Sequence, residues 1–300
     1  MDYSRSGDNV RKLTWFEEFK ASLKTIEAEE IFDLILFRPI SFLFVKLIYN
    51  TNITPNQISI VAMVVGVIGG ITYSFGTHSD FIIASSLYFA CNTLDCADGQ
   101  LARLKKNGTL LGRAIDGFID YIVSTTIYIC LGIAVTKISG NAFYGWALAV
   151  GGGVSAALQA FYFDFYRNSF LQYVHGMSSD VNDEIREFEE EKEKLKKVKG
   201  RPIAKLLINA YLFYSRRQSK MVRSKTTFTV TPEQYYKDNR LLLRLWSWLG
   251  STTHMVMLMF FSIINRIDLY LIFNITICNV LFIIFLVMQK NVLKKYEVQK

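Results

Sequence analysis

The sequence NTLDCADGQLARLKKNGTLLGRAIDGFID (residues 92–120) lies between two apolar runs, FIIASSLYFA (residues 81–90) and YIVSTTIYICLGIAV (residues 121–135). It carries four basic residues and four carboxylates. The carboxylates belong to Asp95, Asp98, Asp116 and Asp120. Insertion scales put an aspartate in the middle of a membrane helix at about 2.5 to 3.5 kcal/mol. Four carboxylates between two membrane-like segments therefore indicate a function that offsets this penalty.

The composition of the whole chain agrees with a membrane protein. Of its 300 residues, 51% are hydrophobic and only four are proline, which is typical of a polytopic helical membrane protein. The net charge of +8 comes from basic residues that lie beside the apolar segments. This placement favours contact with a membrane surface and speaks against nucleic acid as a partner.

Hydropathy predicts six segments long enough to cross a bilayer. They are residues 54–76, 81–102, 113–136, 142–168, 249–265 and 268–288. Thr54 can cap the first helix, and Pro55 suits its first turn. Upstream, the mixed segment FDLILFRPISFLFVKLIYN (residues 32–50) is interrupted by Pro39 and predicts a helix that lies along the membrane surface. The predicted fold is therefore all-α: a polytopic membrane protein with six transmembrane helices and an N-terminal interfacial amphipathic helix.

Loop charge predicts the orientation. With the N-terminus in the cytoplasm, the four basic residues of the 92–120 segment and the lysines of the C-terminal tail are cytoplasmic, whereas the outer loops hold little more than Lys137 and Arg266. The positive-inside rule is then satisfied, with both termini and the aspartates on the cytoplasmic side. Trp246 and Trp248, just before the fifth span, suit the aromatic belt of the same surface.

This organisation divides the chain into four parts. They are a cytoplasmic arm with the interfacial helix (1–50), spans one to four with the aspartates (51–170), a charged cytoplasmic segment (171–248), and spans five and six with a basic tail (249–300). The charged segment contains DVNDEIREFEEEKEKLKKVKG (residues 180–200), where acids precede bases. This order suits a solvated helix.

Helical spacing brings the carboxylates together. Asp95 and Asp98 lie three residues apart, and Asp116 and Asp120 lie four apart, so each pair shares one face of its helix. Because two helices joined by a short loop run antiparallel, both pairs can meet near the cytoplasmic boundary. Arg103 could pair with one of the carboxylates, and so could Arg113.

Four carboxylates without histidine or cysteine are typical ligands for Mg²⁺ or Mn²⁺. Two such ions, about 3.5 to 4 Å apart, form a clamp suited to displacement at phosphorus. Gly99 and Gly112 would let a phosphate or nucleotide approach the backbone, and Ala102 keeps the same face shallow. The four cysteines, in contrast, all lie in apolar segments and are predicted to be free and buried.

Read as D-x2-D-G-x2-A-R-x8-G-x3-D-x3-D, this segment resembles the signature of the CDP-alcohol phosphotransferases, and TPNQIS (residues 54–59) looks like the start of their first span. The resemblance covers about residues 38–170. It implies that a CDP-linked donor, usually CDP-diacylglycerol, binds at the cytoplasmic face, that an alcohol hydroxyl attacks the phosphorus distal to cytidine, and that CMP leaves. Such a reaction belongs to phospholipid biosynthesis.

The resemblance also implies roles for single residues. Asp95, Asp98 and Asp116 would be metal ligands, and Asp120 would be shared between metal binding and deprotonation of the acceptor hydroxyl. The cytidine-phosphate pocket would be shaped by Gly99, Ala102 and Gly112, and Arg103 would hold the motif or the diphosphate.

The acceptor alcohol stays open at this stage. Inositol phosphate, glycerol phosphate, serine and an unusual alcohol are all compatible with the sequence, as is the reverse pairing of a CDP-linked aminoalcohol with diacylglycerol. Basic residues that could recognise a phosphorylated acceptor are Arg167, beside Asp164, and the cluster of Arg216, Arg217 and Lys220. Each of these has a simpler explanation, as a helix-end ion pair or as a site for lipid headgroups. His254 in the fifth span is interpreted as a structural histidine.

Two other functions use aspartates in a helical membrane bundle. An intramembrane prenyltransferase pairs aspartates with Mg²⁺, but the D-G-x2-A-R continuation is not expected there. A cation transporter predicts carboxylates spread across the membrane depth, whereas these cluster beside one loop. Finally, GGGVSAA (residues 151–157) predicts close helix packing, either within the chain or between two copies in a homodimer.

Overall fold

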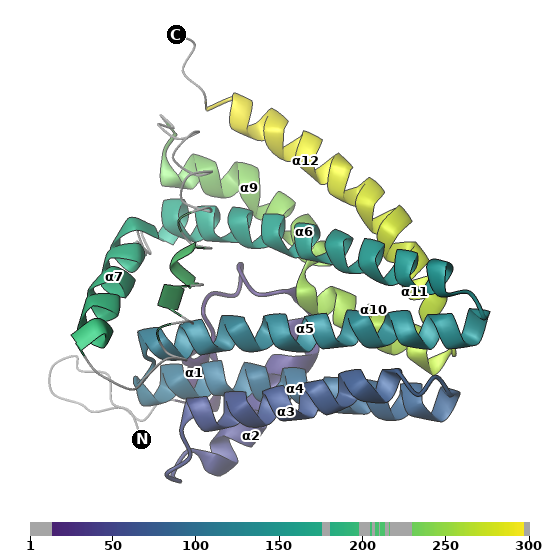
Figure 1. Ribbon diagram of the computed structural model, residues 1–300. Coiled ribbons are helices and arrows are strands. Elements are labelled where there is room, and N and C mark those ends of the chain that lie inside the picture. The colour runs from purple at the N-terminus through teal and green to yellow at the C-terminus, as the bar shows by residue number, and fades with distance from the viewer. Residues whose placement is uncertain are drawn as a thin grey trace, which may run out of the picture.

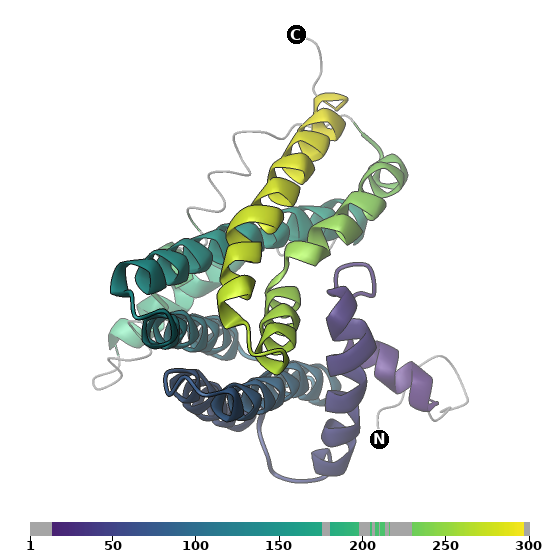
Figure 2. The same cartoon turned by 90° about the vertical axis from the view of Figure 1, so that its right-hand side faces the viewer.

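The computed structural model describes residues 14–175, 181–197, 205, 208–209, 211–213, 216 and 230–296. All regular elements of these residues are helical, which confirms the all-α prediction. In Figure 1, the long helices of the chain lie side by side with the N-terminal helices against them, and Figure 2 shows the same molecule from one end of these helices.

The N-terminal arm consists of α1 (Trp15–Ser22), a π-helical turn η1 (Asp33–Phe37) and α2 (Arg38–Ile48). Pro39 was expected to interrupt the helix, but α2 continues directly from η1 with Pro39 in its first turn. Proline has no backbone N–H, and its ring needs space next to the preceding turn of the helix. The wider π turn before Pro39 provides this space. On α2, Phe42 and Val45 are buried, whereas Leu43 and Leu47 are exposed. This apolar outer face is consistent with a helix at a membrane surface.

The central layer is formed by α3 (Pro55–Tyr73), α4 (His78–Lys105), α5 (Leu110–Ser139) and α6 (Ala142–His175). The predicted start of α3 is confirmed, because Thr54 and Gln57 form a capping box and Pro55 is in the first turn. α3 packs on both α4 and α5, and α5 packs on α6. At Gly66 the approach is so close that a Cβ atom would lie 2.7 Å from the Cys91 sulfur on α4 and 2.9 Å from Val123 on α5. α3 thus brings the two aspartate-bearing helices together.

The rest of the chain packs around this layer. Its elements are α7 (Val181–Lys197), α9 (Pro232–Trp246), η2 (Ser247–Leu249), α10 (Ser251–Ile263), α11 (Ile267–Phe273), η3 (Asn274–Cys278) and α12 (Asn279–Lys294). α9 packs on α6 and α12, and α10 packs on α4 (Figure 1).

The 171–248 segment is less solvated than its charge suggests. The predicted helix near residue 180 is present as α7, but its Phe188 is buried against Ala114 at the start of α5. α9 is an amphipathic helix, and one of its sides is buried. Trp246 at its end is fully buried between Tyr166 and Phe282, so its predicted place in an interfacial belt is wrong, whereas Trp248 is 47% exposed.

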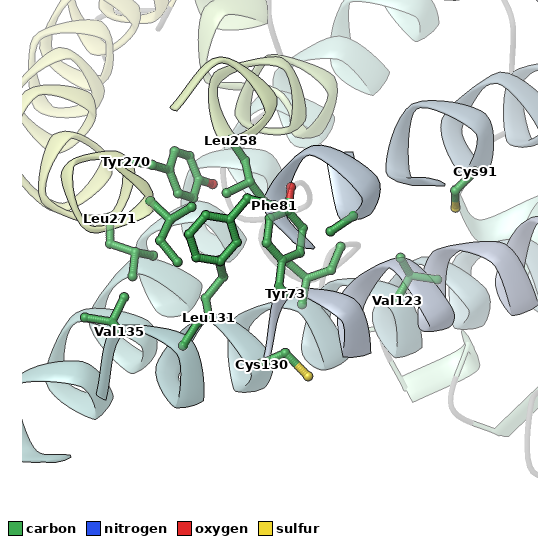
Figure 3. Packing of buried hydrophobic residues seen from close by; sticks show 14 of the residues in the cluster. Tyr73, Phe81, Cys91, Val123, Cys130, Leu131, Val135, Leu258, Tyr270 and Leu271 are labelled. Atoms are coloured by element: carbon green, nitrogen blue, oxygen red, sulfur yellow. The ribbon is translucent and has the colours of Figure 1, made fainter. Parts of the chain in front are cut away.

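The largest core cluster joins α3, α4 and α5 to α10 and α11 (Figure 3). Tyr73, Phe81 and Leu131 are fully buried in it, and Leu258 and Tyr270 enter from the C-terminal helices. The four cysteines are free and buried, as predicted. The glycines of residues 151–153 meet Ile275, Leu271 and Tyr128 of the same chain, so this run supports packing within the chain; a homodimer stays a prediction.

Four helical stretches of the described residues are long and apolar enough to cross a membrane: 55–73, 112–139, 142–174 and 267–294. The expected number of six is therefore not confirmed. α4, predicted as a span over 81–102, contains Asp80, Asp95, Asp98, Arg103 and Lys105. α10, predicted as a span over 249–265, has only 13 helical residues, or about 20 Å at 1.5 Å per residue, less than the hydrocarbon thickness of about 30 Å. Both predictions followed apolar composition alone, without weighing the charged residues of α4 or the short length of α10.

Candidate active site

Three carboxylates meet between α4 and α5. Asp95 and Asp98 on α4 and Asp116 on α5 each offer an oxygen, and these oxygens all lie within 4.8 Å of one another. The i, i+3 spacing on α4 and the antiparallel return of α5 produce this meeting, as the sequence predicted. We call Asp95, Asp98 and Asp116 the aspartate trio.

Two contacts that the sequence did not indicate orient the trio. The Ser59 hydroxyl on α3 lies within hydrogen-bond distance of Asp98 and of the Pro55 carbonyl oxygen, and its single proton can be donated to Asp98. Arg38 on α2 donates from Nη1 to the Cys96 carbonyl oxygen at 3.3 Å, next to Asp95, and its Nη2 is 2.9 Å from a Glu29 oxygen. Ser59 ends the TPNQIS segment one turn after Pro55, which is the only local signal that could have drawn attention to it.

The end of α4 is fixed to the N-terminal arm. The buried Gln100 amide donates to the Ser22 hydroxyl at 3.1 Å and to the Arg38 carbonyl at 3.2 Å, and its oxygen accepts from Ser41 at 2.8 Å. Arg103, one turn after Gly99, donates from Nε to the Ser22 carbonyl. The helix face that carries the trio is thereby held against residues far away in the sequence.

Arg103 and Gly99 are in contact with each other. A Cβ atom on Gly99 would lie 3.3 Å from Arg103 Nη2, and nothing closer is near. The Nη2 atom is buried without a hydrogen-bond partner within the described residues. Arg103 therefore does not form the ion pair with an aspartate that its sequence position allowed, and it keeps one N–H group available beside Gly99.

Gly112 and Ala102 each lie against a neighbouring segment. Gly112 donates its N–H to the capping Thr109 hydroxyl at 3.0 Å, and a Cβ atom there would lie 3.0 Å from Asn56 Oδ1 on α3. The glycine thus permits close packing of α5 on the start of α3. Ala102 is half-buried, and its Cβ atom would lie 3.9 Å from one placed on Gly108 in the α4–α5 loop.

Asp120 lies one turn beyond Asp116 but is not part of the trio. Its side chain is exposed to a cavity of about 620 Å³ between α5, α6 and α10. Most of the cavity wall is apolar, and its polar groups include Asp120, Asp164, Tyr128 and His254. A shared role of Asp120 as a metal ligand stays a prediction, whereas its place on the cavity wall suits contact with a second substrate.

The basic residues considered for the acceptor have other partners. Arg167 pairs with Asp164 at 2.8 Å, and Arg216 pairs with Glu189 at 2.6 Å. Arg113, considered as a partner for the trio, lies 4.0 Å from Glu187 on α7. Arg217 and Lys220 lie outside the described residues. The Nε2 atom of His254 forms a hydrogen bond with Gln159, whereas its Nδ1 atom is buried and has no hydrogen-bond partner among the described residues. Only one of the two ring nitrogens is therefore paired.

A second acidic group, in the N-terminal arm, stabilises α10. Glu30 accepts from the backbone N–H groups of Thr252 at 3.4 Å and Thr253 at 3.2 Å, so it caps the α10 N-terminus. Burial and the neighbouring Asp33 carboxylate raise the pKa of Glu30 to about 8, against the opposing effect of these N–H groups. Burial also acts to raise the pKa of Glu29, but the Arg38 guanidinium, the Lys24 backbone N–H and the Arg103 guanidinium together outweigh it and hold the pKa below its usual range.

The trio fits a divalent cation. All its donors are carboxylate oxygens, which suit Mg²⁺ or Mn²⁺. Asp116 Oδ1 is buried and has no hydrogen-bond partner in the described part of the chain. The positive charges that act on the trio come from Arg38 and Arg103, and Arg38 is already paired with Glu29. The charges of Arg38 and Arg103 therefore do not balance the three carboxylates of the trio.

Comparison with known proteins identifies this region. Residues 52–172 match the family model described as CDP-alcohol phosphatidyltransferase. No curated protein matches the chain. The matched range contains the trio, Asp120 and all the glycines of the pattern. Members of this family transfer a phosphate-linked group from a CDP-alcohol. The resemblance is therefore confirmed for residues 52–172, which match a CDP-alcohol phosphatidyltransferase domain.

Proposed function

We propose that this protein transfers the phosphatidyl group of CDP-diacylglycerol to the hydroxyl of a small polar alcohol and releases CMP, as a step of phospholipid biosynthesis. One observation carries the proposal: within the family's domain, three carboxylates converge within 4.8 Å, and a fourth, Asp120, lies one turn away on the wall of a cavity. This arrangement offers separate places for a diphosphate and for an alcohol.

The trio would hold Mg²⁺ or Mn²⁺, with two ions as displacement at phosphorus favours. When bound, such ions would stabilise the negative charge that develops on the attacking and leaving oxygens. Ser59 would keep Asp98 turned toward the site, and Arg38 would fix the α4 backbone beside Asp95.

The chain's other residues would bind the donor and move one proton. Gly99 leaves the α4 face open, and the buried Nη2 of Arg103 is available to a diphosphate oxygen. Ala102 and Gly112 would border the cytidine-phosphate pocket. The acceptor hydroxyl loses its proton to Asp120 while its oxygen forms a bond to the phosphorus distal to cytidine. The bond between that phosphorus and the CMP oxygen breaks, and CMP leaves with the electron pair.

The protein's orientation is part of the proposal. The ends of α3, α5 and α10 gather away from the trio, where Lys137 contacts the Ser74 carbonyl at 2.7 Å and His78 contacts the Ile263 carbonyl at 2.9 Å. The α4–α5 loop lies at the other end, where Lys105 contacts the Thr51 carbonyl at 2.9 Å. The positive-inside rule supports a cytoplasmic position for this second end, and with it we propose that the active site and both termini are cytoplasmic.

A second pairing is favoured by one observation. The cavity beside Asp120 is bordered mainly by apolar side chains of α5 and α6. Such a wall suits a lipid alcohol, so a CDP-linked aminoalcohol could be the donor and diacylglycerol the acceptor. The chemistry at phosphorus is the same in both pairings, but the lipid enters with a different substrate.

Product analysis tests both pairings. Purified protein in lipid nanodiscs is given Mg²⁺ with either CDP-diacylglycerol and a panel of alcohols, or CDP-choline and CDP-ethanolamine with diacylglycerol. CMP release that depends on one alcohol, with the matching phospholipid as product, supports transfer and names the acceptor. Asp120→Asn is expected to lower the rate by a factor of about 10² to 10⁴, the usual worth of a general base. An undiminished rate in Asp120→Asn would remove Asp120 as the base, and no CMP from any pair would contradict the proposed reaction.

A further inference from the structure

One part of the cavity wall beside Asp120 comes from a segment that is distant in the sequence. Tyr211 lines this cavity together with Asp120 and with Ala114 at the start of α5. The Tyr211 ring stacks on Phe188 of α7, with the two ring centroids 4.1 Å apart. Figure 1 shows α7 at the end of the molecule where α5 begins. α7 therefore holds Tyr211 against the cavity at this end.

α7 and the helical residues that follow it form one unit. An apolar cluster joins Phe188 to Ile208 and Leu212, and all three are buried. Glu189 of α7 also pairs with Arg216 at 2.6 Å. We call this unit the cover; it consists of α7 and the described helical residues 205, 208, 209, 211–213 and 216.

The contact between the cover and the rest of the described chain is small. In the apolar cluster, only Ala114 belongs to α5. The ion pair of Arg113 with Glu187 is 4.0 Å long, and its side chains are 53% and 56% exposed, so it adds little and is weakened by salt. α7 is absent from the extensively packed helix pairs of the described residues. Separating the cover from α5 should therefore need much less energy than unfolding the protein.

A removable wall at this place has a chemical use. Asp120, as the proposed base, can take a proton from water as well as from an alcohol. Water that attacks the phosphorus while Asp120 takes its proton would break the bond to CMP and hydrolyse the donor. An enzyme that transfers to an alcohol must therefore keep water away from this carboxylate during the reaction. It must also exchange water-soluble compounds with its surroundings between reactions.

We infer that the cover is a lid of the active site, which opens to exchange water-soluble compounds and closes to keep water from Asp120 during transfer. The purpose of the lid rests on the proposed function, whereas its movement is a property of the fold alone. Phe188 does not line the cavity, so it is a positioning residue that acts through Tyr211.

Thiol labelling tests the movement without any substrate. Ala114→Cys places a thiol under the cover, and Cys91 in the largest core cluster reports unfolding of the whole protein. The probe is a polyethylene glycol maleimide too large to pass through the cavity. Ala114→Cys should react at least about 10-fold faster than Cys91. Adding Phe188→Ala should raise its rate by about 10-fold again, because a buried ring is lost. Phe213→Ala, at a 65% exposed ring of the same cover, is the matched control and should leave the rate unchanged.

Two tethers test the need for opening in turnover. Arg113→Cys with Glu187→Cys, bridged by a short bis-methanethiosulfonate, ties the cover to α5. Glu189→Cys with Arg216→Cys, bridged by the same reagent, ties the cover only to itself. The first tether should lower the rate of CMP release by a factor of about 5 or more, and a reductant should restore it. The second tether should leave the rate unchanged.

Product analysis tests the exclusion of water. The ratio of hydrolysed donor to transferred product should rise by a factor of about 3 to 10 in Phe188→Ala, because water then reaches Asp120 more often. Phe213→Ala should keep the wild-type ratio. A general loss of stability would lower both products together and leave the ratio unchanged.

The outcomes separate the lid from the proposed function. Ala114→Cys that reacts as slowly as Cys91, full turnover with the first tether, or an unchanged product ratio in Phe188→Ala would each overturn the lid. A wild-type protein that releases no CMP contradicts the proposed function, yet fast labelling of Ala114→Cys would still support a cover that opens.

Discussion

Replacing Gly99 with alanine is expected to stabilise the fold and to impair the reaction at the same time. The nearest atom to a Cβ at this position is Arg103 Nη2, at 3.3 Å, the far end of a flexible side chain that can move by a few tenths of an ångström. Alanine is favoured over glycine inside a helix by about 1 kcal/mol. Gly99→Ala should therefore raise the free energy of unfolding by up to about 1 kcal/mol.

The same methyl group would stand beside the trio and against the N–H group that Arg103 keeps available. If a donor diphosphate approaches the α4 backbone here, the added methyl group must weaken its binding, so the KM for the CDP-linked donor should rise. Thermal unfolding in detergent and initial rates of CMP release would be measured on the same preparation.

Gly66→Ala is the matched control, because its Cβ would lie 2.7 Å from the Cys91 sulfur and 2.9 Å from Val123. Such overpacking destabilises by about 1 to 3 kcal/mol. Stability should therefore change in opposite directions in the two variants. A Gly99→Ala protein that is less stable, or that retains the wild-type KM for the donor, would refute an open face at Gly99.

Two further predictions concern the N-terminal arm. Glu30 has a pKa of about 8 in the fold and about 4.5 when unfolded, so the folded state retains its proton longer and wild-type stability should fall as the pH rises from about 4.5 to 8. Glu30→Gln should lose this dependence in thermal unfolding at pH 5.5 and 8, and an unchanged slope would show that Glu30 does not cause it. Arg38→Met should destabilise by about 3 kcal/mol or more, because it leaves the buried Glu29 carboxylate without its partner. Glu29→Met combined with Arg38→Met should recover most of that loss, since a buried ion pair replaced by apolar groups is often neutral; a double variant as unstable as the single one would argue against the pair.

Local spacing predicted much of the site. Asp95 and Asp98 share a face because they lie three residues apart, and Asp116 joins them because a short loop makes α4 and α5 antiparallel. The capped start of α3 was equally readable, from Thr54 followed by Pro55. These features depend on helix geometry over a few residues.

Long-range contacts could not be predicted in this way. Ser59 meets Asp98 across 39 residues of sequence, and His254 meets Gln159 across 95. No periodicity encodes such pairs, because they depend on how α3, α6 and α10 pack. His254 was accordingly interpreted as a satisfied structural histidine, although only one of its two nitrogens has a partner.

The ends of α4 were missed because the predicted span followed hydropathy alone. α4 extends at both ends beyond the predicted 81–102, to His78–Lys105, because Thr77 and Asp80 form a capping box at its start and Lys106 adopts a left-handed conformation at its end. Trp246 was placed at the membrane surface from its position before an apolar run. It is instead covered by aromatic residues of α6 and α12, which are distant in sequence.

The most direct test of the aspartate trio as a divalent-metal phosphotransfer site is the Mg²⁺ dependence of CMP release. Wild type, Asp116→Asn and Asp80→Asn would be compared with the donor and alcohol that support release. Asp80 caps the far end of α4, so Asp80→Asn changes the same charge away from the site. Release that requires Mg²⁺, is lost in Asp116→Asn and is kept in Asp80→Asn is the predicted result. Release that persists in Asp116→Asn with the wild-type Mg²⁺ dependence would contradict a metal site at the trio.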